Sequence, residues 1–141
     1  MWRGNLANEI KRIKNFTKDI KKISKLFKYL LKTKKVKEIY IFPYTKAFLE
    51  RSLKYNFFDN ICVYRNPKET EFDKFIKHNK KHKFITIRPF GGKLKLLRKH
   101  KLKYLLNYSI SNNNIKRVIL TCSNKKQIGQ IVSFCNDKKN F

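Results

Sequence analysis

Apolar side chains in the first part of the chain recur in steps of three or four residues. Such steps place them on one face of an α-helix, so the pattern predicts a helix over residues 5–34. Asn15 and Thr17 are residue types that begin helices, because their side chains accept a hydrogen bond from an unpaired first-turn N–H. We therefore expect a break near residue 15 that separates an N-terminal helical arm, residues 1–15, from residues 16–141. The apolar stripe comprises Leu6, Ile10, Ile13, Phe16, Ile20, Ile23, Phe27, Leu30 and Leu31.

After this helix, short apolar runs alternate with amphipathic stretches. The runs are rich in β-branched and aromatic residues, as expected of strands buried on both faces of a sheet. Strands that alternate with helices indicate a parallel sheet with right-handed crossovers, so the pattern predicts an α/β fold of four βα units. Two architectures fit units of this size: half of a (β/α)8 barrel, or a small open sheet with helices on both faces. The predicted strands are 39–42, 61–64, 84–87 and 118–120, and the predicted helices are 45–55, 69–81, 95–111 and 124–136.

The composition fits one domain with enough apolar residues for a core. The chain has 141 residues, of which 41% are hydrophobic. No apolar run is long enough to cross a membrane, and residues 1–5 lack the apolar segment of a secretory signal. Cys62, Cys122 and Cys135 have no CxxC spacing and fit reduced thiols. A cytoplasmic location is the resulting expectation.

The charge is strongly positive, with 36 Lys and Arg residues against 9 Asp and Glu residues and a formal net charge of +27. Such a charge suggests a polyanion partner, because basic side chains that neutralise phosphates release counterions. The lysines are spread along the chain, however, and the chain is also rich in Asn, Ile, Phe and Tyr, whose codons are rich in A and T. We favour compositional drift and general solvation, and keep a basic nucleic-acid or polyanion-binding module on an α/β fold as the alternative function.

Four segments resemble, in order and spacing, the fifth to eighth strands of the aldo/keto reductase barrel. These segments are VKEIYIFPY at residues 36–44, FFDNICVYRN at 57–66, FITIRPFGGKL at 84–94 and VILTCSNKKQI at 118–128. The resemblance covers residues 16–141 and is most distinctive at Pro-Phe-Gly-Gly. It implies a partial (β/α)8 TIM barrel, an aldo/keto reductase-like half barrel preceded by a helix. It also implies an origin among NADP-dependent oxidoreductases.

The chain departs from the family at the positions that hold the nicotinamide. By the resemblance these positions are Phe42, Pro43, Cys62 and Arg65, and none keeps the family's side-chain chemistry. The family's catalytic Asp, Tyr, Lys and His come from its first four strands, which have no counterpart here. Without the tyrosine there is no general acid to complete a hydride transfer. We expect no catalytic residue and no oxidoreductase activity from this chain alone.

The phosphate side of the NADP site is better preserved. Glycines after a strand allow backbone N–H groups to approach a phosphate closely, and a helix N-terminus favours anions. Gln130 occupies a position where the family often has an adenine-contacting Glu, and Ile131 replaces the family's Asn. The resemblance therefore implies weak or lost NADP binding. The residues it assigns to the cofactor are Arg88, Pro89, Phe90, Gly91, Gly92, Leu94, Ser123, Asn124, Lys125, Lys126, Gln127 and Gln130.

Simpler interpretations compete at several of these positions. Gly91 and Gly92 also suit a plain turn before a helix, and Ser123 with Asn124 suits the N-cap of the last helix. His78 and His82 have the i, i+4 spacing of a zinc pair, but their lysine-rich surroundings supply no further ligand and we expect no metal site.

A half barrel leaves a parallel edge and one side of its core uncovered. We expect the chain to form a homo-oligomer, to pair with a separately encoded N-terminal half, or to pack its N-terminal helix across the open side.

Overall fold

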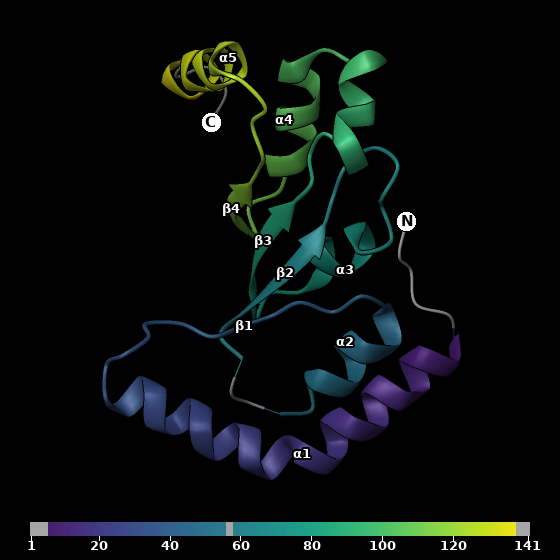
Figure 1. The fold of residues 1–141 in the computed structure, drawn as a ribbon, viewed down its shortest axis with the longest axis vertical. Helices are drawn as coiled ribbons and strands as arrows, with labels where there is room; N and C mark the ends of the chain where they lie inside the picture. Colours follow the sequence, from purple (N-terminus) through teal and green to yellow (C-terminus); the bar gives the residue numbers. More distant parts are fainter. Residues whose placement is uncertain (1–5, 56–57, 138–141) are drawn as a thin grey trace.

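The computed structural model describes residues 6–55 and 58–137, which form helices around one sheet (Figure 1). The strands lie in the middle of the molecule. A long helix lies at one end, and two helices with a 3-10 segment lie at the other. In chain order the elements are α1 (Leu6–Lys32), β1 (Tyr40–Ile41), α2 (Lys46–Ser52), β2 (Asn60–Tyr64), α3 (Asp73–His78), β3 (Lys83–Ile87), η1 (Gly92–Arg98), α4 (Leu102–Ile110), β4 (Ile115–Ile119) and α5 (Lys125–Asn136).

The sheet has four strands in the order β1-β2-β3-β4, and every neighbouring pair is parallel. The prediction of an α/β fold with a parallel sheet of βα units is thereby confirmed. The spatial order of the strands equals their order in the chain, so each crossover moves one strand further in the same direction. Right-handed crossovers in that order place the connecting helices on one face of the sheet.

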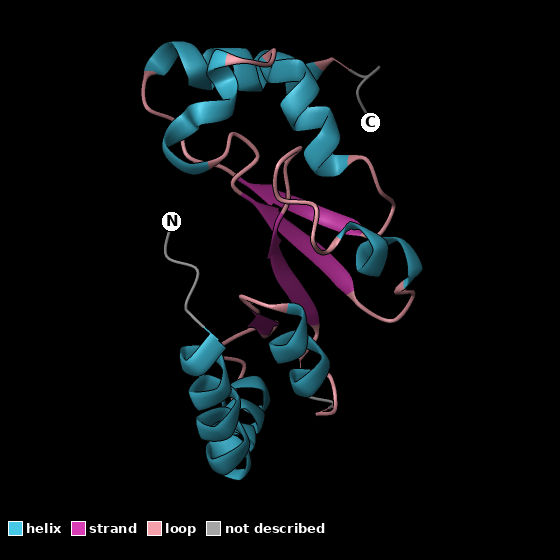
Figure 2. Ribbon diagram, turned by 90° about the vertical axis from the view of Figure 1, so that its right-hand side faces the viewer, coloured by secondary structure: helices cyan, strands magenta, loops and turns pink. Residues whose placement is uncertain are grey.

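The two faces of the sheet differ in burial. On one face Ile61, Val63, Phe84 and Thr86 are completely buried against the helices. On the other face Cys62 and Tyr64 are only partly covered, and Ile119 of the edge strand β4 is 55% exposed. The expectation of strands buried on both faces is therefore wrong for β4, because among the described residues no second layer of helices covers that face (Figure 2).

The long helix α1 is continuous from Leu6 to Lys32, so the predicted break near residue 15 is wrong. The hydroxyl of Thr17 donates 2.8 Å to the carbonyl of Ile13 within the helix and therefore does not begin a new one. Phe16 and Phe27 pack against Phe58 in the core that α1 shares with the sheet. In Figures 1 and 2, α1 lies beside α2 at the β1 end of the sheet and does not cross the open face.

Two predicted helices are interrupted. The pattern over 95–111 divides into η1 and α4, since Lys101 adopts an extended backbone between them. The pattern over 69–81 yields only α3, because Asn79 is extended and its side-chain oxygen accepts from the backbone N–H groups of Lys81 and His82. Asparagine readily makes such local turns, and this turn overrides the helical pattern.

A second apolar cluster lies beyond the carboxyl ends of the strands. It joins η1, α4 and α5 through Phe90, Leu96, Leu105, Leu106 and Phe134. Because this cluster anchors the segments that follow β3 and β4, it sets where those segments leave the sheet.

The two edge strands are tied together near their amino ends. Glu38, just before β1, accepts a hydrogen bond of 2.6 Å from the ammonium of Lys116 in β4 and a second one from the hydroxyl of Tyr40. The hydrogen bond from Lys116 lowers the pKa of Glu38. The pairing of β3 with β4 shifts register between Phe84 and Ile85, which leaves Lys116 unpaired in the ladder.

Within the part of the chain described, no helix is both long and apolar enough to traverse a bilayer.

Candidate functional site

The segments that resemble the cofactor loops leave the sheet at the carboxyl ends of β3 and β4. In parallel α/β sheets, ligands bind in the crevice outside these ends, because the loops there converge while the strands hold them in place. A hollow of about 600 Å³ lies at this point. It is lined by Ile87, Arg88, Pro89, Phe90, Gly91, Gly92, Ile119, Thr121 and Ser123, a set called here the strand-end hollow.

Six predicted cofactor residues thus meet in one cavity. Arg88 to Gly92 come from the loop after β3, and Ser123 comes from the loop after β4. Thr121 also lines the hollow and was not among the predicted residues, although its hydroxyl and its place after a strand were visible in the sequence. Two exposed hydroxyl-bearing residues, Thr121 and Ser123, line the hollow together with the arginine loop.

Among the described residues that line the hollow, Arg88 alone is basic, and its backbone is in the left-handed region at φ 60°. Its guanidinium lies 4.6 Å from the centre of the Tyr64 ring and 3.5 Å from the carboxylate of Glu69. The side chain remains 28% exposed. A cation stacked on an aromatic face keeps its donor edges available, so Arg88 is positioned and still accessible to an anion.

A buried asparagine holds the Arg88 loop against the segment after β2. The side-chain amide of Asn66 donates 2.9 Å to the carbonyl of Arg88 and 2.5 Å to the carboxylate of Glu69. Its oxygen accepts from the backbone N–H groups of Lys68 and Glu69. Asn66 and Glu69 are both buried, so these hydrogen bonds hold the left-handed backbone conformation of Arg88 in place.

The two glycines of the loop have different roles. Gly91 has φ 72°, a conformation that side-chain-bearing residues rarely adopt. A Cβ on Gly92 would lie 2.5 Å from a terminal nitrogen of Arg88, so this glycine gives the guanidinium its space. Gly91 and Gly92 therefore form the turn that leads into η1, and they also line the hollow.

Of the remaining predicted cofactor residues, those whose side chains the structure describes do not line the hollow. Asn124 is the N-cap of α5, where its side chain accepts 3.0 Å from the backbone N–H of Gln127, so its interpretation as a cap is confirmed. The side chain of Gln127 in turn accepts from the backbone N–H of Ser123 at 2.7 Å. Lys125, Lys126 and Gln130 are exposed on α5, and the side chain of Leu94 lies outside the described residues.

The four positions assigned by resemblance to the nicotinamide have other roles. Phe42 packs against the rings of Tyr44 and Tyr64 at 4.9 and 5.0 Å, and Pro43 is buried. Burial raises the pKa of the Cys62 thiol to about 11. A neutral thiol in a strand is a poor hydrogen-bond partner for an amide, so these positions offer packing and little polar recognition.

Arg65, the fourth of these positions, belongs to a polar cluster that sequence reasoning missed. Its Nε donates 2.9 Å to Asp73, its guanidinium stacks on the Tyr108 ring at 4.6 Å, and it also donates to the Tyr108 carbonyl. The hydroxyl of Tyr108 donates 2.6 Å to Asp73, and burial, followed by Asp73, raises the pKa of Tyr108 to about 12. Ser111 accepts from the same guanidinium at 3.3 Å. The spacing of these residues along the chain does not predict that they form a cluster.

The two histidines with zinc-pair spacing do not share a helix, since α3 ends at His78. His82 is buried, no described group bonds to its Nδ1, and burial lowers its pKa. Among residues 6–55 and 58–137, no three His, Cys, Asp or Glu side chains cluster so as to hold a metal ion.

Comparison with models of protein families, with curated proteins and with solved structures found no match to this chain.

Proposed function

We propose that this chain is a phosphate-binding half barrel related to the aldo/keto reductases, which binds a nucleotide such as NADP weakly in the strand-end hollow. The observation that carries the proposal is the convergence of two loops, residues 88–92 and 121–123, in one cavity at the carboxyl ends of parallel strands. The sequence resemblance assigned both loops to the phosphates of the same cofactor.

The strand order supports the half-barrel architecture over the open sheet with helices on both faces. A doubly wound sheet reverses direction along its strand order, whereas a barrel adds each strand beside the last. The order β1-β2-β3-β4 contains no reversal, and the uncovered face carries Cys62, Tyr64 and Ile119. In a closed barrel this face would point inward.

The chemistry of the hollow suits one phosphate group. The guanidinium of Arg88 supplies charged donors, and the hydroxyls of Thr121 and Ser123 supply neutral donors from the opposite loop. Glu69 competes for the same guanidinium at 3.5 Å. A charge-assisted hydrogen bond contributes roughly 1.5–3 kcal/mol. At the lower end of this range two such bonds total about 3 kcal/mol, which corresponds to a dissociation constant of roughly 6 mM, so binding is weak.

The proposal excludes independent reductase activity. Reduction requires a nicotinamide held by polar side chains and a general acid beside the carbonyl. Phe42 and Cys62 supply packing where the family supplies hydrogen bonds, and the guanidinium of Arg65 is occupied by Asp73 and Tyr108.

Calorimetry with NADPH and with ADP, each at low and high salt, tests the site. Ser123→Asp places a carboxylate in the hollow and is expected to abolish binding of both ligands. Ser133→Asp, an equal charge change at an exposed position of α5, is expected to leave binding within about twofold. Equal loss in both variants would show that net charge alone attracts the nucleotide. NADPH-dependent reduction of a carbonyl substrate by the isolated chain would contradict the proposed lack of activity.

The uncovered face also supports the proposal of a homo-oligomer or of pairing with a separately encoded N-terminal half. Light scattering on the isolated chain tests the first case, where a mass twice that of the chain is expected. Co-purification with a candidate half tests the second.

A further inference from the structure

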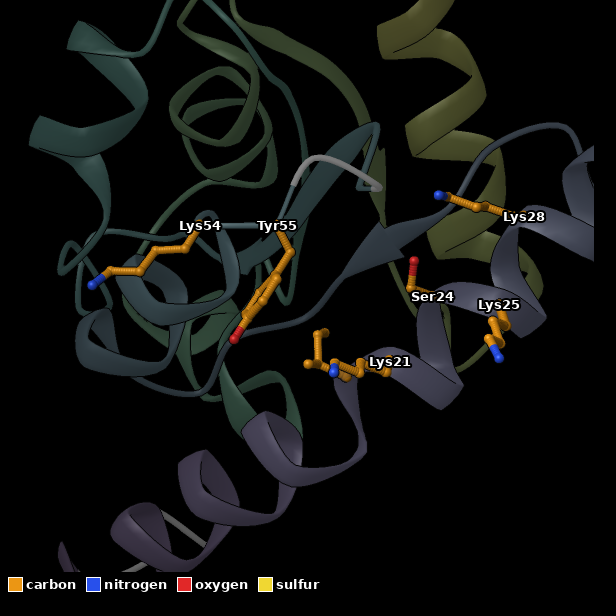
Figure 3. A pocket seen from close by; sticks show the side chains of 7 residues that line it. Lys21, Ser24, Lys25, Lys28, Lys54 and Tyr55 are labelled. Carbon is orange, nitrogen blue, oxygen red and sulfur yellow. The ribbon is translucent and has the colours of Figure 1, made fainter.

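A basic concave surface lies far from the strand-end hollow, between α1 and the segment that follows α2. It encloses about 710 Å³ and is lined by Ile20, Lys21, Ser24, Lys25, Lys28, Lys54 and Tyr55, a set called here the lysine groove (Figure 3). Figure 3 shows Tyr55 reaching toward α1 while Ser24 and Lys28 point into the space between them.

The helix supplies three of the four lysines from one flank. Lys21, Lys25 and Lys28 follow the i, i+4, i+7 spacing, which places their side chains above one another along α1. At a rise of 1.5 Å per residue they extend over about 10 Å of the helix. The opposite wall adds Lys54, whose side chain extends away from α1 in Figure 3, so the row on α1 supplies most of the charge that faces the groove. A linear, multiply charged anion fits such a row better than a single compact phosphate does.

The charge of the groove is not neutralised within the described part of the protein. The four ion pairs found there join Arg65 to Asp73, Arg88 to Glu69, Lys103 to Asp137 and Lys116 to Glu38. None involves a lysine of the groove, and none of the described residues that line it is acidic. All four lysines are exposed and are therefore accessible to a ligand. A polyanion that binds here releases its condensed counterions, which is the main driving force for binding to phosphate backbones.

The groove also has an apolar component. Ile20 and Tyr55 are half-buried, and the edge contact between Tyr55 and Phe16, with ring centres 5.8 Å apart, holds the tyrosine in place. An aromatic side chain beside a row of cations is the arrangement that binds unpaired bases and their backbone together. In a duplex the base faces are stacked on each other and cannot contact Tyr55.

We propose that the lysine groove binds single-stranded nucleic acid, with Lys21, Lys25 and Lys28 along its phosphates, Lys54 at the margin of the groove and Tyr55 against a base. This site is independent of the strand-end hollow, since the two share no residue.

Fluorescence anisotropy with a labelled oligonucleotide of about 12 nucleotides, across a range of salt concentrations, tests the charge component. Lys21→Glu, Lys25→Glu and Lys28→Glu together are expected to weaken binding by about tenfold or more. The slope of log affinity against log salt should fall by about 2, since each phosphate contact on a single strand contributes about 0.7. The matched control replaces Lys74, Lys77 and Lys80, which are exposed on and after α3, by Glu. An equal loss in the control would overturn the proposal, because bulk charge would then explain the binding.

Tyr55→Leu tests the base contact while keeping an apolar side chain against Phe16. It is expected to weaken oligonucleotide binding by about fivefold or more and to leave binding of an abasic sugar-phosphate oligomer unchanged. Equal weakening for both probes would overturn the assigned role of Tyr55. Duplex DNA, inorganic polyphosphate and anionic vesicles serve as competitors, and any that matches the single strand in affinity would overturn the proposed ligand. Circular dichroism confirms that each variant is folded, and Ser123→Asp is expected to bind the oligonucleotide normally.

Discussion

Arg65 and Arg88 occupy equivalent places at the carboxyl ends of neighbouring strands, yet they have opposite roles. Each stacks on a tyrosine ring at 4.6 Å, and each has a carboxylate partner. The side chain of Arg65 is only 8% exposed and has its carboxylate at 2.9 Å. The side chain of Arg88 is 28% exposed, has its carboxylate at 3.5 Å and lines a hollow. The same residue type thus stabilises the fold at one strand end and remains available to a ligand at the next.

The difference arises from what covers each guanidinium. The carboxyl end of α4 covers Arg65 with Tyr108 and Ser111, which accept hydrogen bonds from both terminal nitrogens of its guanidinium. Gly92 lies against a terminal nitrogen of Arg88, and a glycine supplies no side chain to bond with it. The sequence shows an arginine directly after β2 and another directly after β3. The residues that pack against each guanidinium decide whether that arginine has a structural or a binding role.

The largest expected effect is that of Arg65→Ala. Removing Arg65 takes one donor from Asp73 and one from the Tyr108 carbonyl, which keep the hydroxyls of Tyr108 and Ser111 as donors. The side chain of Asp73 is 30% exposed, so the cost is about 3 kcal/mol of unfolding free energy, the lower end for breaking a buried ion pair. Urea denaturation followed by circular dichroism measures this change. The control Lys68→Ala removes an exposed charge nearby and should change stability by less than about 0.5 kcal/mol. A similar, small change in both variants would mean that the Arg65 cluster is not structural.

Arg88→Ala is expected to have a smaller effect on stability and a decisive effect on binding. It leaves the buried carboxylate of Glu69 with the Asn66 amide as a remaining donor, so the cost is about 1–3 kcal/mol. Calorimetry should detect no binding of ADP. If Arg88→Ala bound ADP with the affinity of the unchanged protein, Arg88 would not be a ligand-binding residue, and its proposed difference from Arg65 would be wrong.

The Arg65 cluster should also respond to alkaline pH through Tyr108. The folded state raises the pKa of this tyrosine from its ordinary value of 10 to about 12, chiefly by burial and then by the hydrogen bond to Asp73. The unfolded chain therefore loses the proton first, and stability falls as pH rises from about 10 to 12. Ultraviolet titration of the phenolate, compared with that of Tyr108→Phe, measures the shift. A tyrosine that ionises near pH 10 in the folded protein would contradict the assignment.

The smallest effect is expected from Lys125→Glu combined with Lys126→Glu. Both side chains are exposed on α5 and lie outside the lining of the hollow, so ADP affinity should fall by no more than about threefold. The matched double change at Lys80 and Lys81 should produce a similar loss. A selective loss of more than tenfold for the α5 pair would show that these lysines reach the ligand and that Arg88 does not bind it alone.

Local patterns were sufficient to predict the four strands and the helix that precedes them. The run Phe84–Ile87 was found because its β-branched and aromatic side chains suit a buried strand. The beginning of β4 was missed because Lys116 and Arg117 belong to an exposed edge, where burial does not select apolar residues. The separation of η1 from α4 was also missed, since the spacing of leucines continues across it.

The sites were less predictable than the strands. The loops that line the strand-end hollow follow strands directly, so their meeting could be inferred from topology. The Arg65 cluster joins residues 8 and 43 positions apart, and the lysine groove joins α1 to Lys54 and Tyr55. Such contacts depend on how helices pack against other segments. The spacing of apolar residues within one segment does not predict that packing.

The tie between Glu38 and Lys116 has a consequence for how this protein behaves at high concentration. Two unpaired strand edges are templates on which other chains add strands, and such growth leads to fibrils. Here β1 is only two residues long, and β4 carries a register shift with a lysine drawn toward Glu38. A strand that docked on β4 would meet an irregular ladder and a cationic side chain at that point. We therefore expect these edges to resist fibril growth, so Lys116→Val should shorten the lag before thioflavin-positive aggregates form.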